Sequence, residues 1–140
     1  MEEVYFASAA VKLSYDKEIL LGKAVWQGFQ SSNEFRENGM RSLQLIREQG
    51  LVRWLANQRD MRAIRQLDLN WVVAELMPSL IASPLRRMAI VVSADIFNKM
   101  AMEQLFKRAG NLGDLIIKEF DSEDIAREWL LQSVTAEVLA

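Results

Sequence analysis

The stretch Met88-Ala89-Ile90-Val91-Val92 contains five consecutive apolar residues. A strand with one solvated face alternates apolar and polar side chains, whereas a strand covered on both faces is apolar throughout. We therefore expect residues 88–92 to form a central strand of a parallel sheet that carries helices on its faces.

A helical pattern precedes this strand. Val72, Leu76 and Leu80 recur at the spacing of one helix face. Asp68 is the expected N-cap, because its short carboxylate can accept a hydrogen bond from a free backbone amide. Pro78 falls inside the pattern and predicts a kink or break, since proline has no amide hydrogen to donate.

A second helical pattern follows the strand. Ser93 or Asp95 is expected to cap this helix, and Phe97 and Leu105 are expected on its inner face. Gly110 supplies the stop, because glycine adopts the left-handed conformation that ends many helices.

Farther upstream, Ser31 and Glu34 have the spacing of a capping box, which predicts a helix that begins there and ends at Gly50. Four residues are expected on its buried face: Phe35, Gly39, Leu43 and Ile46.

The remaining elements are shorter. Residues 4–13 and 19–26 predict an antiparallel hairpin around a polar loop at residues 14–17. Residues 51–56 predict a third strand that ends at Asn57, and residues 115–120 predict a fifth.

A last helix is expected to open at Asp121. Glu123 and Asp124 then lie in its first turn, where negative charge favours the positive end of the helix dipole.

In chain order these segments predict an α/β fold with the order ββαβαβαβα. This is a mostly parallel five-stranded sheet with an N-terminal antiparallel hairpin and four main helices. A chain of 140 residues has an ordinary size for one domain. We expect a single domain over residues 1–140, with a core of about residues 4–131 and a short C-terminal tail.

The composition excludes several kinds of chemistry. The chain has no Cys and no His, so it cannot build a thiol nucleophile, a Ser-His-Asp triad or a Cys/His zinc site. We therefore expect a protein that is not an enzyme and needs no cofactor or metal. The net charge of −2 gives no overall attraction to phosphate backbones, so we expect no nucleic-acid partner.

The start of the chain, residues 1–5, is acidic where a secretory signal would be basic. The longest strongly apolar run, residues 88–92, is far shorter than the ~20 residues of a membrane span. These features predict a cytoplasmic protein without an integral membrane segment.

Candidate site residues gather where strands are expected to end. Asn57, Arg59 and Arg62 follow the predicted third strand, and Ser93 and Asp95 follow the predicted fourth. In open α/β sheets, ligands and partners bind beyond the carboxyl ends of the strands. The arginines could meet an acidic partner there, and the alternative is a solvated, salt-bridged surface.

The chain also has four Trp and seven Met residues. Trp71, Met77 and Trp129 lie in or beside helical apolar stripes. Two interpretations stay open: ordinary core packing, or the lining of a pocket for an apolar ligand.

Parts of the chain resemble the SpoIIAA-like branch of the STAS domains, the fold of the anti-sigma-factor antagonists. The resemblance is carried by the apolar strand 88–92 with the helix at 97–106, and by residues 120–130, which contain the pattern A-x-x-W-L. The element order is similar as well, so the resemblance covers about residues 4–131. More distantly, the chain resembles the CRAL-TRIO lipid-transfer domains.

The resemblance implies a regulatory module that binds a protein partner. Anti-sigma antagonists carry a phosphorylatable Ser or Thr after the third strand, and here the matching residues 57–62 contain none. No Ser, Thr or Tyr occurs between Leu51 and Pro78, so we expect the phosphorylation switch to be missing. The lipid-binding relatives imply an alternative function, a carrier or sensor of a small apolar, lipid-like ligand. A homo-oligomer is compatible with either function.

Overall fold

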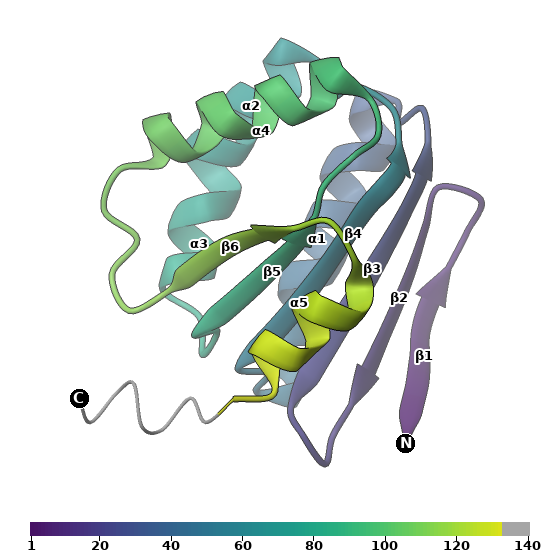
Figure 1. Cartoon of the computed structure of the whole chain (residues 1–140), viewed down its shortest axis with the longest axis vertical. Helices are drawn as coiled ribbons and strands as arrows, with labels where there is room; N and C mark the ends of the chain where they lie inside the picture. The colour runs from purple at the N-terminus through teal and green to yellow at the C-terminus, as the bar shows by residue number, and fades with distance from the viewer. Residues whose placement is uncertain (133–140) are drawn as a thin grey trace.

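The computed structural model describes residues 1–132, and within them the chain forms one six-stranded sheet with helices on both faces (Figure 1). The tail expected after residue 131 lies, from residue 133 onward, outside the described residues. The predicted α/β class is confirmed. The strands are β1 (Glu2–Ala7), β2 (Val11–Asp16), β3 (Leu21–Gly28), β4 (Arg53–Met61), β5 (Arg87–Val91) and β6 (Ile116–Phe120).

The order of the strands across the sheet follows their order along the chain. β1, β2 and β3 form an antiparallel meander, and β3 to β6 run parallel to one another. The parallel pairs are connected by helical crossovers, as the alternating pattern predicts.

The N-terminal segment is divided differently from the expected hairpin. Residues 4–13 contain two strands, because Ser8 makes a turn between them: its hydroxyl oxygen accepts a hydrogen bond from the amide of Val11, and its own amide donates to the Val11 carbonyl. Such local bonds compete with a continuous strand. β2 and β3 form the predicted antiparallel pair, with Leu13 opposite Ala24. The described part of the sheet therefore has six strands rather than five.

The strand expected at residues 88–92 is β5, shifted by one residue. All five of its residues are buried, and it lies between β4 and β6 rather than at an edge. The predicted end of the preceding strand at Asn57 is wrong, because β4 continues to Met61. The extension is stabilised by pairing with the last residues of β3, where Gly28 lies opposite Met61.

The helices divide unequally between the two faces. One face is covered by α1 (Ser32–Gln49), α2 (Gln66–Trp71), the π-helical segment η1 (Val72–Leu76), α3 (Met77–Ile81) and α4 (Ile96–Ala109). The other face is covered by α5 (Glu123–Leu130), seen in front of the sheet in Figure 1. Each face has its own group of buried apolar residues. We call the first the four-helix face and the second the α5 face.

The caps of α1 are those that the sequence predicts. The Ser31 hydroxyl accepts from the Glu34 amide at 3.2 Å, and the Glu34 carboxylate returns to the Ser31 amide. Gly50 ends the helix with a φ of 60°. The four residues expected on the inner face are all buried.

Asp68 does not cap a helix, and that prediction is wrong. The helix begins at Gln66, so Asp68 lies inside its first turn. Its buried carboxylate accepts hydrogen bonds from the Ser32 hydroxyl at 2.9 Å and from Arg36 Nε at 3.1 Å. Asp68 therefore joins α2 to α1, a role that depends on tertiary contact.

The predicted distortion at Pro78 takes the form of a π-helix. The five residues of η1 lie immediately before α3, in which Pro78 occupies the first turn. Proline cannot donate to the carbonyl four residues earlier, and its ring crowds that carbonyl. A wider π-type turn moves the proline ring and this carbonyl apart, and the helix continues beyond them.

Two details of the later helices also differ from expectation. Asp95 caps α4 as predicted, accepting from the Phe97 amide at 2.9 Å. However, the Phe97 side chain is 72% exposed, because the inner face of α4 begins with Asn98. α5 is capped by the Ser122 hydroxyl rather than by Asp121.

The four-helix face depends on a close approach between β3 and β4. Gly22 lies opposite Trp54 in the ladder, and the indole ring lies over the glycine. A Cβ atom at position 22 would be 2.4 Å from Trp54 Cζ3 and 2.7 Å from Leu51 Cδ1. Contacts this short require the ring or the backbone to move.

We expect Gly22→Ala to lower the free energy of unfolding by about 1–3 kcal/mol, the usual cost of forcing an extra carbon into a packed core. Chemical denaturation measures this change. In a Trp54→Leu background the same substitution should cost less, because the rigid ring is gone. An equal cost in both backgrounds would show that the ring is not the obstacle.

Candidate functional site

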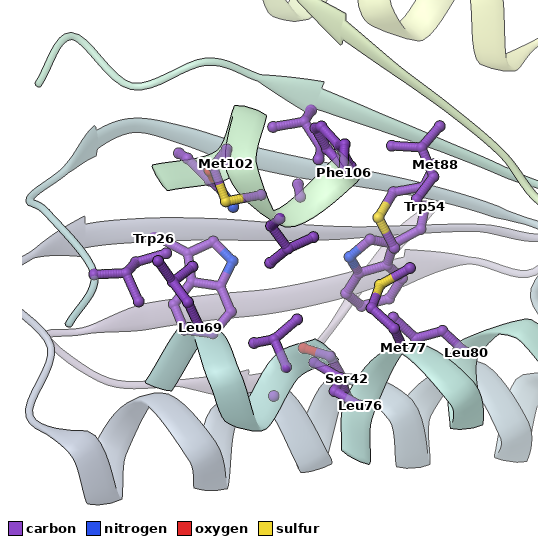
Figure 2. A pocket seen from close by; sticks show the side chains of 18 of the residues that line it. Trp26, Ser42, Trp54, Leu69, Leu76, Met77, Leu80, Met88, Met102 and Phe106 are labelled. Atoms are coloured by element: carbon purple, nitrogen blue, oxygen red, sulfur yellow. The ribbon is translucent and has the colours of Figure 1, made fainter. Parts of the chain in front are cut away.

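A cavity of about 100 Å³ lies between the sheet and the helices of the four-helix face. Figure 2 shows it from close by, with the strands behind it and helices on either side. The sheet contributes Trp26 from β3 and Trp54 from β4. The helices contribute Phe35 from α1, Met77 from α3 and Met102 from α4. The lining comes from strands β3 to β6 and from α1, α2, η1, α3 and α4, which together surround one apolar space.

Small residues leave this space open. On the cavity side of β4, Ala56 stands between the larger Trp54 and Gln58. On α1, Gly39 lines the cavity with no side chain, and a Cβ there would be 3.2 Å from Trp71. The missing side chain at Gly39 lets Trp71 and Leu76 pack against α1, and the short side chain of Ala56 leaves room on the sheet side of the cavity.

The cavity contains three polar groups that make no hydrogen bond within residues 1–132. The Gln58 Oε1 atom is buried without a partner. The indole N–H groups of Trp26 and Trp54, in side chains only 7% and 3% exposed, donate to no described residue. In Figure 2 the two indole nitrogens lie on the ring edges that face each other across the cavity. Buried polar groups are normally paired. Gln58 Oε1 is an exception, because it is fully buried without a partner, whereas the two unpaired indole nitrogens keep some accessible surface.

Within residues 1–132, no charged or titratable side chain lines the cavity. Ser42 is the remaining polar residue of the lining, and its hydroxyl is already used, donating to the Asn38 carbonyl at 2.9 Å. The cavity is therefore mostly apolar, with two unpaired indole donors and the side-chain amide of Gln58, whose oxygen and nitrogen make no hydrogen bond to the described residues.

The sequence-predicted strand-end residues do come together. The Arg59 carbonyl accepts from the Ala94 amide at 3.1 Å, and the Ser93 hydroxyl donates to the Met61 carbonyl at 2.7 Å. These two bonds join the end of β4 to the loop between β5 and α4. The expected juxtaposition of the two strand ends is present.

Most of these side chains have local partners. Asn57 Nδ2 donates to a Glu123 oxygen at 3.4 Å, and the Arg59 guanidinium donates to the Asp121 carbonyl at 3.2 Å. Ser93 is buried and Asp95 caps α4. The backbone amide of Arg62 donates to the Gly28 carbonyl at 3.0 Å, but its exposed side chain makes no hydrogen bond or ion pair with the described residues. Of the predicted set, Arg62 is the side chain most available to a partner.

The described chain also offers neither a metal-binding cluster nor a membrane-spanning helix. Among residues 1–132, no group of three or more acidic side chains is placed to hold a metal ion. Within the same residues, no helix combines the length and apolar character needed to cross a membrane.

Comparison with protein-family models, curated proteins and solved structures found no match to this chain. The resemblance to the SpoIIAA-like family therefore stays a hypothesis from the sequence. The function has to be inferred from the cavity and the surface themselves.

Sequence reasoning missed most of the cavity residues. It considered Met77, but it did not single out Trp26, Ala56 or Gln58. One signal was present: Trp54, Ala56 and Gln58 alternate along one strand, which places them on one face of the sheet with a small residue in the middle. Trp26 comes from another strand, so its place opposite depends on the register of β3 and β4.

Two buried alanines on adjacent strands test whether the space is real. Ala56 lines the cavity, whereas Ala89 lies in the closed core of the α5 face. We expect Ala56→Ile to leave the free energy of unfolding unchanged or to raise it by up to about 1 kcal/mol, because the added carbons fill a void. Ala89→Ile should lower it by about 1–3 kcal/mol through overpacking. If chemical denaturation showed that both substitutions lower the free energy of unfolding equally, the cavity beside Ala56 would be contradicted.

Proposed function

We propose that this protein is a carrier or sensor of a small apolar ligand, which it binds in the cavity between the sheet and the helices of the four-helix face. The observation that carries the proposal is the pair of unpartnered indole N–H groups of Trp26 and Trp54 at an apolar cavity. An ordinary core gives neither the space nor unused donors.

Two features of the unliganded protein favour ligand binding. An unfilled cavity of about 100 Å³ costs roughly 2 kcal/mol relative to a filled core. A hydrogen bond to an unpaired indole N–H adds about 0.5–1.5 kcal/mol. A ligand that fills the space and accepts from an indole N–H removes the cost of the cavity and makes this bond, and the two gains together are the driving force for binding.

Benzene is a suitable first probe, because it is apolar, rigid and the size of one side chain. We expect saturating benzene to raise the melting temperature of the wild-type chain, since a ligand that binds only the folded state stabilises it. The same titration should shift the amide resonances of residues around the cavity. The Ala56→Ile variant, with its cavity reduced, should show neither effect.

Native mass spectrometry of the purified protein complements this titration by looking for a bound small molecule. A wild-type chain that is indifferent to saturating benzene and carries no bound compound would contradict the proposed function.

A second candidate function is a non-enzymatic, protein-interaction or regulatory module of the SpoIIAA-like kind, without its phosphorylation switch. The observation that favours it is an exposed apolar group on the first turns of α4, made of Ile96, Phe97 and Met100. Arg62 lies beside this helix start, since the neighbouring Met61 is bonded to Ser93. Exposed apolar side chains with a free cation fit a partner protein with an acidic rim.

If a partner docks there, Arg62→Glu should weaken its binding about tenfold or more, because a like charge then faces the acidic rim. Lys17→Glu makes the same charge change in the turn between β2 and β3, at the opposite end of the sheet, and should leave binding unchanged. Both variants should keep the wild-type melting temperature. Binding measured by affinity capture that responds equally to both variants would exclude this surface.

A further inference from the structure

We infer that the ligand is a neutral molecule of about one ring that accepts a hydrogen bond, and that the indole N–H groups of Trp26 and Trp54 recognise it. This inference rests on the proposed function and specifies its ligand class. It follows from three properties of the cavity: its volume, its lack of charge and the kind of polar group it leaves unused.

The volume limits the size. Pockets for drug-sized ligands measure roughly 300–1,000 Å³, whereas this cavity measures about 100 Å³. An engineered apolar cavity of ~150 Å³ in another protein binds benzene. A single ring is therefore the right scale, and a diacyl lipid is too large. The lipid-like ligand implied by the CRAL-TRIO resemblance is thus replaced by a much smaller one.

The lining excludes a charged ligand. An ion transferred into an apolar space needs a compensating charge or several hydrogen bonds, and none of the described lining residues is charged. A neutral ligand meets no such cost, because most of its surface contacts the apolar side chains that surround it.

The unused polar groups specify the ligand's polar atom. The two indole N–H groups can only donate, so their complement is an acceptor, such as a ring nitrogen or a carbonyl, ether or hydroxyl oxygen. They come from adjacent strands and face each other across the space (Figure 2). A ligand in this space can place its acceptor at one of the two donors while its ring contacts the apolar lining.

A further polar region lies toward the carboxyl ends of the strands. Gln58, near the end of β4, leaves its buried Oε1 without a partner. Asn98 is fully buried in the first turn of α4, and both atoms of its side-chain amide are unpaired within the described chain. It lies one turn before Met102, which lines the cavity. A hydroxyl on the ligand could accept from an indole and donate to Gln58.

Water is the competing occupant. A buried water usually makes about three hydrogen bonds, and cavities lined by apolar side chains stay dry. Most residues around this cavity are apolar, and its three polar groups are carried by two strands rather than gathered at one point. An organic ring satisfies the apolar lining, which water does not.

Benzene and pyridine form a matched pair for the test. The two rings have the same size, and pyridine alone carries an acceptor; at slightly alkaline pH it is uncharged. We expect at least one of Trp26→Phe and Trp54→Phe to weaken pyridine binding by about two- to tenfold, the usual value of one neutral hydrogen bond. Benzene affinity in that variant should change less than pyridine affinity. Trp129→Phe, on the α5 face, is the control and should change neither affinity.

The outcomes separate the two proposals. If wild type binds neither ring, the proposed function fails and this inference fails with it. If wild type binds benzene while both variants bind pyridine as tightly as wild type does, the ligand-class inference is overturned and the cavity function stands.

A direct measurement on the wild-type chain covers the case in which a variant does not fold. Pyridine should move an indole N–H proton resonance of Trp26 or Trp54 downfield, and benzene should not. Equal shifts with both rings would overturn the inference.

Discussion

The contact between Trp54 and Gly22 is the constraint on which the four-helix face depends. Only a residue without a side chain lets the indole ring lie against β3, and the ring position sets one wall of the cavity. If the ring were displaced outward, it would enter the volume that α3 and α4 now border. The absence of a side chain at one strand position therefore controls the packing of helices far from it in sequence.

The two faces of the sheet have different physical characters. On the α5 face, Arg53 and Arg87 lie opposite each other in register, and both donate to carbonyls at the end of α5. Arg53 Nε donates to Leu130 at 2.6 Å, and Arg87 donates to Trp129 at 2.7 Å. Cations suit the negative end of a helix dipole. Burial, and then repulsion from Arg87, lowers the pKa of Arg53. On the α5 face, hydrogen bonds from the two arginines hold the helix against the sheet. On the four-helix face, apolar side chains pack between the helices and the sheet and leave a cavity.

The parts that could be predicted from the sequence are those fixed by local chemistry. The capping box at Ser31, the left-handed stop at Gly50 and the buried strand β5 each depend on residues near one another in the chain. The failures have tertiary causes. Asp68 resembles a cap in sequence but binds Arg36 on another helix, and Phe97 fits an inner helix face that packing assigns to its neighbour.

The same division applies to the candidate sites. The meeting of the strand ends could be predicted, because topology alone brings them together. The cavity could not be predicted, because it is the volume left unfilled between Trp26, Trp54 and Ala56. Sequence periodicity shows which side chains face inward, but it does not show whether they fill the space. The register of the β3–β4 ladder supplies that information.

The strands lie side by side in the sheet in the same order as they occur along the chain, and this matters while the protein is being synthesised. Each strand, as it leaves the ribosome, finds its only upstream neighbour already in place, so the described sheet can grow from one side without waiting for a distant segment. Contacts of low sequence separation favour fast folding. The exception is α5, which returns across β4 and β5 from near the end of the described chain. Until it emerges, one apolar surface of the nascent sheet stays uncovered, and this is the interval in which the chain is most open to aggregation.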